Sequence, residues 1–479
     1  MEFRIWVETR LAGRVLEREL VSSVERPASA IGPEEIGLTL DEGKAILRKV
    51  QGRIVQTQVD ALSAAHRRCF GCGQNQRVKD IRTRVARTIF GTVQVSCRRY
   101  FRCKCRGGKK TAMWLLNRRQ LSGTSPELQY LYATWGSKVP YRRAAAAVGE
   151  LLPICDHGVS HSTLRRHTLA VGSRLDQRVT EPDEYDWPEP RREPVPAARN
   201  LSVAIDGTYV RADGMMGLGE CHVIAGRIEP EGRRGGHFAW VAQNPMCDAK
   251  AFMKAALEDN GWTPTSRVRV LADGADGLSN LVKTSAERTI LRVLDWFHIS
   301  MRLRPIEQMA PGIATIVGDA DPVLIELLNE KIDRVRFQMW NGHWQAALDR
   351  MGAIYRATKG YLSSPSIIDA ERIHRFRKHM LDLRDYLCRN QIALRNYAAD
   401  RRNGLRISSA LAESAMSHLV NQRMGKRQPM RWSAEGAHLL LQVRCAVLDN
   451  RLEMLFREWL PKFRQQLPQP PLIGCRPQL

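Results

Sequence analysis

The stretch "LSVAIDGTYV", residues 201–210, decides the predicted fold of this chain. Leu201, Val203 and Ile205 alternate with smaller or polar residues, a pattern typical of one buried face of a β-strand. The apolar run ends at Asp206, and a glycine follows directly. A carboxylate in this position is informative because ligands bind outside strand ends in open α/β sheets.

A second stretch, "RVRVLADG", has the same form and places Asp273 after an apolar run. If the two strands are neighbours, Asp206 and Asp273 converge at one edge of the sheet. Ionised carboxylates in close proximity repel each other, and a divalent cation relieves this repulsion. Hard oxygen ligands suit Mg²⁺ or Mn²⁺, and two such ions would support phosphoryl transfer. The alternative for either aspartate is a cap at a turn, and Asp276 competes with Asp273.

We expect a third acid from "SSALAESAM", in which Glu413 lies on a predicted amphipathic helix over residues 406–424. The small neighbouring residues would let this helix approach the strand edge closely. Glu371 and Glu435 remain alternatives by position alone. The ordinary explanation for Glu413 is an acid favoured by the dipole in the first half of a helix.

The segments that follow residue 200 predict an α/β fold. Three apparent strands, "LSVAIDGTYV", "CHVIAGRIE" and "HFAWVAQ", come in succession, and "DAKAFMKAALEDNG" then has a helical pattern. Two further strands end at Asp273 and near Asp295, and residues 301–400 are helical in pattern. This order predicts a mixed sheet with helices on its faces.

The charge of the chain favours a polyanionic partner. The net charge is +24, and 16 Lys or Arg against one acid give +15 between His66 and Arg119. Such a cluster suits the release of counterions from a nucleic-acid backbone. The alternative is a basic but otherwise ordinary enzyme, because net charge bears on association and not on fold.

Cysteines flank the basic cluster in two close pairs. No apolar run is long enough for a membrane span and no secretion signal is visible, so we expect a cytoplasmic protein with reduced thiols. Reduced cysteines in close pairs favour a tetrahedral structural zinc site, with free buried thiols as the alternative. Cys97 is a possible substitute ligand, and the four expected zinc ligands are Cys69, Cys72, Cys103 and Cys105.

Two segments are candidates for binding DNA. The sequence between the cysteine pairs alternates with period two about a glycine, which predicts a hairpin. Its arginines are expected to contact phosphates: Arg82, Arg84, Arg87, Arg98, Arg99 and Arg102. Residues 125–176 have a helix-turn-helix pattern, with an ordinary helical hairpin as the alternative. The start of its last helix would read bases through Ser162, Thr163, Arg165 and Arg166.

Several of these motifs together resemble one family. They are "GLTLDEGKAILRKVQ" at 37–51, the C-x2-CG…C-x-C module, "VAIDGTYV", "LADGADGL", "LDWFH" and "AESAMSHLVNQRMGKRQPMRWS". The chain resembles DDE-type insertion-sequence transposases of the ISKra-like group, relatives of the mutator-type transposases. The resemblance covers most of the chain, and its specificity lies in the combination of motifs.

The resemblance implies an RNase H-like catalytic core with an all-helical insertion, preceded by a zinc-ribbon-like module and a helix-turn-helix domain. It implies that Asp206, Asp273 and Glu413 hold two Mg²⁺ or Mn²⁺ ions. It further implies a D-x2-H signature, matched by Asp295 and His298, for which the alternative is a buried pair that orders the core. The implied partners are double-stranded DNA, as terminal inverted repeats and target, and further copies of the chain on that DNA near the nucleoid.

These observations divide the chain into eight segments. They are an N-terminal strand and long helix for dimerisation or local packing (1–66), the zinc-ribbon-like module (67–119), the helix-turn-helix domain (120–176), a Pro-rich linker (177–200), the first part of the core (201–300), the helical insertion (301–400), the core completion with Glu413 (401–460) and a Pro-rich tail (461–479).

The expected function is cleavage of DNA at the ends of an element and strand transfer into a target. A catalytically inactive or domesticated DNA-binding regulator, which keeps zinc and helix-turn-helix recognition, is the alternative. A different RNase H-like nuclease is a third possibility, against which the separate DNA-reading domain argues.

Overall fold

The computed structural model describes residues 1–11, 13–28, 32–33, 36–101, 103–106, 112–114, 123–154, 159–181, 195–214, 217, 219–245, 247–274, 276–318, 321–329, 331–363, 367–425 and 430–465. The chain forms two compact units. Unit 1 comprises Met1–Ser173, Trp187–Arg191 and Arg451–Leu479, and unit 2 comprises Arg174–Asp186 and Arg192–Asn450. Most of the predicted linker and the tail from residue 466 lie outside the described residues.

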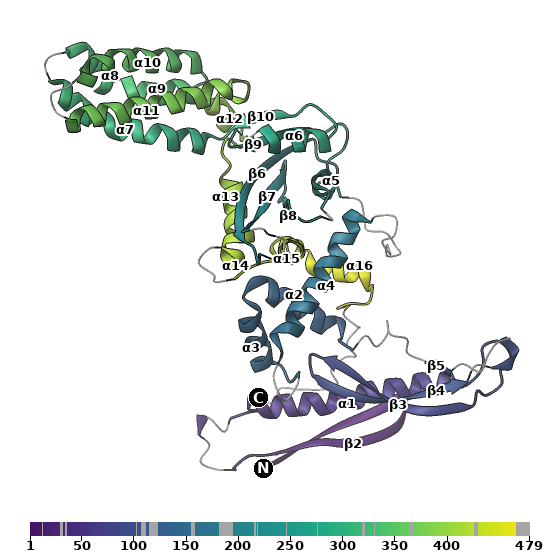
Figure 1. Ribbon diagram of the computed structural model, residues 1–479. Helices are drawn as coiled ribbons and strands as arrows, with labels where there is room; N and C mark the ends of the chain where they lie inside the picture. Colours follow the sequence, from purple (N-terminus) through teal and green to yellow (C-terminus); the bar gives the residue numbers. More distant parts are fainter. Residues whose placement is uncertain are drawn as a thin grey trace, which may run out of the picture. The chain divides into compact units, whose positions relative to one another are not determined.

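Unit 2 is built on a mixed five-stranded sheet with the strand order β10-β9-β6-β7-β8 (Figure 1). Strands β6, β7 and β8 are antiparallel neighbours, whereas β9 is parallel to β6 and β10 is parallel to β9. The prediction of an α/β fold with a mixed sheet is therefore confirmed. The strands are β6 (Asn200–Arg211), β7 (Glu220–Pro230), β8 (Gly236–Val241), β9 (Arg267–Ala272) and β10 (Leu291–Leu294).

Helices cover the sheet because its strands are apolar. Val203 and Ile205 of β6 belong to a buried cluster with residues of α5 (Ala249–Asp259) and α6 (Asp276–Ser285). Successive residues of a strand face opposite sides, so Ala204 and Asp206 face away from that cluster. Helix α13 (Ala410–Met416) packs across β6 and β7.

The outer edge of β8 is closed by side chains of α15 (Ala434–Leu448) and the residue that follows it. Asp449 accepts from the His237 N–H at 2.8 Å, and Gln442 donates to the Ala239 carbonyl at 2.9 Å. The ring of His438 contacts the Val241 N–H at 3.3 Å. An unpaired strand edge can add strands of other chains, so these contacts protect it.

A helical bundle is inserted between β10 and α13, as expected for residues 301–400 (Figure 1). It begins earlier than predicted, since α7 starts directly after Asp295, which caps it. One buried cluster joins the bundle to Leu271, Val293 and Leu294 at the ends of β9 and β10. The helices are α7 (Trp296–Val317), α8 (Pro322–Asn329), α9 (Lys331–Trp340), α10 (Trp344–Ala357), α11 (Ile367–Arg389) and α12 (Tyr397–Arg402).

Unit 1 begins with an antiparallel hairpin and a long helix. The sequence predicted one short strand, but β1 (Glu2–Leu11) pairs with β2 (Arg14–Glu25) along its length. The predicted long helix is present as α1 (Leu40–Ala65). Several large apolar residues of the hairpin are exposed, among them Phe3, Trp6 and Leu16.

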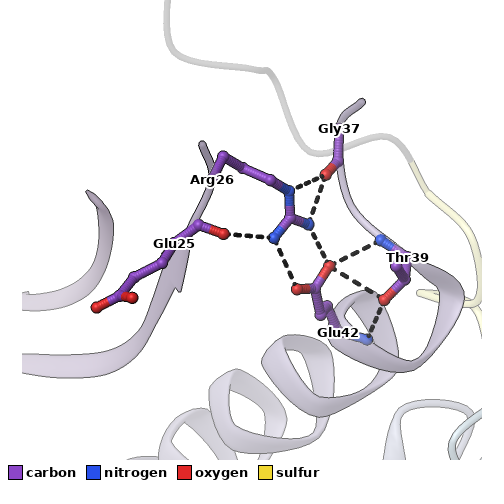
Figure 2. A network of polar contacts seen from close by, with 5 residues as sticks. All are labelled: Glu25, Arg26, Gly37, Thr39 and Glu42. Carbon is purple, nitrogen blue, oxygen red and sulfur yellow. Dashed lines mark hydrogen bonds and ion pairs between the residues drawn. The ribbon is translucent and has the colours of Figure 1, made fainter. Parts of the chain in front are cut away.

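Arg26 ties this hairpin to the start of α1 (Figure 2). Its guanidinium donates to both carboxylate oxygens of Glu42, at 3.0 and 2.5 Å, and to the Gly37 carbonyl at 2.6 and 3.0 Å. Glu42 also completes a capping box with Thr39, the N-cap residue of α1. The hydrogen bond from Arg26 is the main reason why the pKa of Glu42 is lowered to about 2.

The described residues in the rest of unit 1 include two small cores. Strands β3 (Val78–Thr88), β4 (Gly91–Phe101) and β5 (Ala112–Trp114) form a sheet that packs on α1. Helices α2 (Pro126–Lys138), α3 (Tyr141–Leu151) and α4 (His161–Thr180) share a second core. The C-terminal helix α16 (Leu452–Trp459) packs on α2, with Phe456 and Tyr130 in edge-to-face contact, although the predicted segment 401–460 grouped it with the core.

Candidate functional site

Strand β6 places Asp206 where its parallel neighbour ends. Pairing of β6 with β9 stops at Ala204, whereas pairing with β7 continues to Arg211. The apolar run ends at Asp206, but the strand continues beyond it, as predicted for residues 201–210, because β7 supplies hydrogen-bond partners as far as Arg211. Asp206 is half-buried, and one carboxylate oxygen accepts from the Gly207 N–H at 2.7 Å.

Asp273 and Asp295 directly follow the two parallel strands β9 and β10. Leu294 pairs with Ala272 in the last register position, and the Asp295 N–H donates to the Ala272 carbonyl at 3.1 Å. Both acids therefore leave the sheet at the same edge. The competing residue Asp276 instead starts α6 and is ion-paired with Arg292.

Glu413 reaches this edge from α13, and His298 reaches it from the first turn of α7. Potential metal-ligating atoms of Asp295, His298 and Glu413 all lie within 4.8 Å of one another. The alternatives to Glu413 lie elsewhere on exposed positions, Glu371 on α11 and Glu435 in the first turn of α15. Of the three glutamates, Glu413 is the one that the fold brings to the acids.

Asp295 has a different environment from the other acids because it is fully buried and accepts four hydrogen bonds. One oxygen accepts from the Phe297 N–H at 2.8 Å and the Ser409 N–H at 3.0 Å. The other accepts from His298 Nδ1 at 2.6 Å and from the Ser409 hydroxyl. Burial acts to raise the pKa of Asp295, but the bonds from His298 and Ser409 outweigh it and leave that pKa lowered.

The pKa values of the remaining titratable groups at this edge depend on burial and on one another's charges. Burial and then the charge of Asp273 raise the pKa of Asp206, while burial and then the charge of Asp295 raise that of Glu413. The hydrogen bond to Asp295 raises the pKa of His298, helped by the charges of Asp273 and Asp206. Each ionised carboxylate thus disfavours the ionisation of its neighbours, and a bound cation would reduce this electrostatic repulsion. Most of the potential donors at this edge are carboxylate oxygens, which are ligands that suit Mg²⁺ or Mn²⁺.

Two tyrosines of the helical bundle hold the strand ends that carry acids. The Tyr386 hydroxyl donates to the Asp273 carbonyl at 2.9 Å, and the Tyr397 hydroxyl donates to the Leu294 carbonyl at 2.9 Å. Sequence reasoning missed both residues and also Ser409, because a lone tyrosine or serine carries no pattern that points to a distant strand.

We expect Tyr386→Phe to loosen the backbone at Asp273 while keeping the ring in place. One lost hydrogen bond predicts a fall of about 1 kcal/mol in the free energy of unfolding. We also expect weaker Mn²⁺ binding, measured by calorimetry alongside denaturant titration. Tyr355→Phe, the same change in α10, is the control, and equal Mn²⁺ affinity in both variants would contradict the role of Tyr386.

The helix predicted over residues 406–424 is present from Ala410 to Met424, ending with α14 (Gln422–Met424), but part of it is not α-helical. Within it, Ser417–Asn421 forms a π-helix directly after α13. The physical reason is that the buried Arg444 of α15 donates to the Leu419 carbonyl at 2.6 Å and to the His418 carbonyl. π-helical turns of this kind are frequent beside functional sites.

The four cysteines expected to bind zinc come together in unit 1. Their sulfurs lie within 4.8 Å of one another, with Cys69 and Cys105 at 3.5 Å and Cys72 and Cys103 at 3.4 Å. Four sulfurs about 2.3 Å from a tetrahedral zinc ion are roughly 3.8 Å apart, so the set fits this metal. The N–H groups of Gly71 and Cys72 lower the pKa of Cys69 to about 6, which favours the thiolate.

Cys97, the possible substitute ligand, belongs to a core instead. It is buried on β4 with Val93, Val95, Ala86 and Val59. Its pKa is raised by burial, as for a structural thiol.

The hairpin arginines lie on β3 and β4. Arg82, Arg87 and Arg98 are exposed and Arg84 is half-buried, whereas Arg102 lies outside the described residues. Arg99 is ion-paired with Asp80, so its guanidinium already has a carboxylate partner. At the start of α4, Ser162, Arg165 and Arg166 are exposed and Thr163 is half-buried.

No protein-family model matches this chain, and a search of curated proteins found no similar sequence. Among the helices that the structure describes, none is both long and apolar enough to cross a lipid bilayer.

Proposed function

We propose that this chain is a DDE-type transposase with an RNase H-like core, which cuts DNA at element ends and joins it to a target. The observation that carries the proposal is the approach of Asp295, His298 and Glu413 to within 4.8 Å of one another, at the sheet edge where Asp206 and Asp273 also lie and influence their charges. These residues come from β6, the ends of β9 and β10, α7 and α13, and they lie up to 207 positions apart in the sequence.

The fold supports the proposal as well. Along the chain, the three antiparallel strands β6, β7 and β8 come first, and the parallel strands β9 and β10 then extend the sheet beside β6. This arrangement is the one expected of an RNase H-like core. The helical bundle between β10 and α13 corresponds to the insertion that the resemblance implies. The acids lie where β9 and β10 end, as expected for a ligand site in such a sheet.

In this proposal Asp206, Asp273 and Glu413 would hold two divalent cations. Ions held there would activate an attacking oxygen and stabilise the leaving oxygen in phosphoryl transfer. His298 lies beside them with its ring fixed through Nδ1 by Asp295. Catalysis then depends on positioning and charge neutralisation, without a covalent link between protein and DNA.

The test uses purified full-length chain and labelled duplexes from the DNA that flanks its coding sequence. We expect cleavage and joining in Mg²⁺ or Mn²⁺ and none with a chelator, with product ends mapped to the nucleotide. Binding without cleavage in either metal would reject the enzyme and favour the alternative of a DNA-binding regulator.

The zinc-ribbon-like module is proposed to contact phosphates through its hairpin. Replacing Arg82, Arg84, Arg87 and Arg98 by glutamine is expected to weaken binding to all duplexes. The slope of log K against log salt should flatten by roughly 0.9 for each lost phosphate contact. Fluorescence anisotropy at several salt concentrations measures this, and an unchanged slope would place the DNA elsewhere. Arg356→Gln, at an exposed position of α10 in the helical bundle, is the control for losing an arginine outside this module.

A further inference from the structure

Ser409 stands at the N-cap position of α13, yet its side chain does not cap the helix. A serine at this position usually accepts a hydrogen bond from the second or third N–H of the helix. Here the hydroxyl instead donates to a carboxylate oxygen of Asp295, and the Ser409 N–H donates to the other oxygen at 3.0 Å. The Ser409 hydroxyl therefore leaves α13 without a side-chain cap from its N-cap residue and binds Asp295, which lies 114 positions earlier in the sequence.

Ser409 also lies one helical turn before Glu413. Its carbonyl accepts from the Glu413 N–H at 3.0 Å, so one residue bonds to Asp295 through its N–H and hydroxyl and to Glu413 through its carbonyl. Beside it, the Trp296 N–H donates to the Ile407 carbonyl at 3.1 Å. The start of α13 is thus held against the start of α7, which carries His298.

We propose that Ser409 is a positioning residue that fixes Glu413 against His298 through the buried carboxylate of Asp295. This inference rests on the proposed function. Asp295 serves as the junction because its two oxygens are each occupied by two donors. In this role Asp295 orients His298 and the start of α13 beside the metal site.

The experiment compares Ser409→Ala with Ser408→Ala in the full chain. Ser408 is the matched control because its hydroxyl accepts from the Ala410 N–H at 3.1 Å at the same helix start, without contact to Asp295. Removing a partner that orients metal ligands typically costs about 10–100-fold in metal affinity or activity. We therefore expect Ser409→Ala to bind Mn²⁺ 10–100-fold more weakly by calorimetry, and Ser408→Ala to bind as the wild type does.

Three further measurements separate positioning from a general loss of structure. The unfolding midpoint and the affinity for duplex DNA are expected to change little in Ser409→Ala, while the rate of strand cleavage falls with Mn²⁺ affinity. Ser409→Thr, which keeps a hydroxyl, is expected to bind Mn²⁺ within about threefold of the wild type, because the bond to Asp295 is retained. Equal losses of Mn²⁺ and DNA binding would overturn the positioning role.

The outcomes also distinguish this inference from the proposed function. Wild-type Mn²⁺ binding and cleavage, together with an unaffected Ser409→Ala, would overturn the role of Ser409 alone. A wild-type chain that binds no Mn²⁺ would overturn the proposed function, and the positioning role with it.

Discussion

Asp206→Asn is expected to abolish strand cleavage and joining while DNA binding stays intact. Loss of a metal ligand removes several kcal/mol of charge stabilisation in the transition state, or on the order of 10³-fold in rate. The control is Asp276→Asn, because Asp276 is an exposed aspartate of the same sheet edge that pairs with Arg292. Gel assays of labelled duplexes measure cleavage, and cleavage that survives in Asp206→Asn would remove this residue from the site.

The same variant has an opposite effect on stability without metal. Burial and Asp273 raise the pKa of Asp206, so the ionised carboxylate destabilises the folded chain above its usual pKa. Asparagine carries no charge, and we expect the unfolding midpoint at neutral pH to stay equal or rise in chelator. With Mn²⁺ the order reverses, because a bound ion stabilises the wild type by mass action. A midpoint that falls in chelator would point to a structural role.

Sequence patterns predicted which aspartates lie near strand ends better than they predicted the strand pairing and helix packing around them. The runs before Asp206 and Asp273 predicted strands, and the parallel pairing of β6 with β9 brings them to one region. The sequence predicted the strand over residues 201–210, but it could not show that pairing with β9 stops at Ala204 while pairing with β7 continues past Asp206. Glu413 could not be separated from Glu371 or Glu435 by pattern, since only packing of α13 on the sheet distinguishes them.

The residues that hold the site escaped prediction for a related reason. Ser409, Tyr386 and Tyr397 each bond to a strand end at least 103 positions away. No local period encodes such a contact. The π-helix after α13 also depends on a distant group, the buried guanidinium of Arg444. What periodicity predicts is the element, whereas side-chain bonds between distant elements determine the geometry of the site.

The second large effect concerns the cysteine cluster, for which we expect Cys72→Ser to lose stoichiometric zinc. Structural zinc sites with four ligands have apparent binding free energies of about 10–16 kcal/mol, so one ligand is worth roughly a quarter of this. That share corresponds to roughly a 10²-fold loss of affinity or more. Metal analysis of the purified chain and competition with a chromogenic chelator measure it.

Cys97→Ala is the matched control because Cys97 is a buried cysteine of the same module that lies in its core. It is expected to keep one zinc per chain, with a modest fall in stability from the lost side-chain volume. In Cys72→Ser, the loop from Cys69 to Gln76 loses its link to the end of β4, so we expect it to become sensitive to protease. DNA affinity should fall with it, since Arg82 and Arg98 lie on the strands that this link supports. One zinc per chain in Cys72→Ser and none in Cys97→Ala would mean that Cys97, and not Cys72, is the zinc ligand.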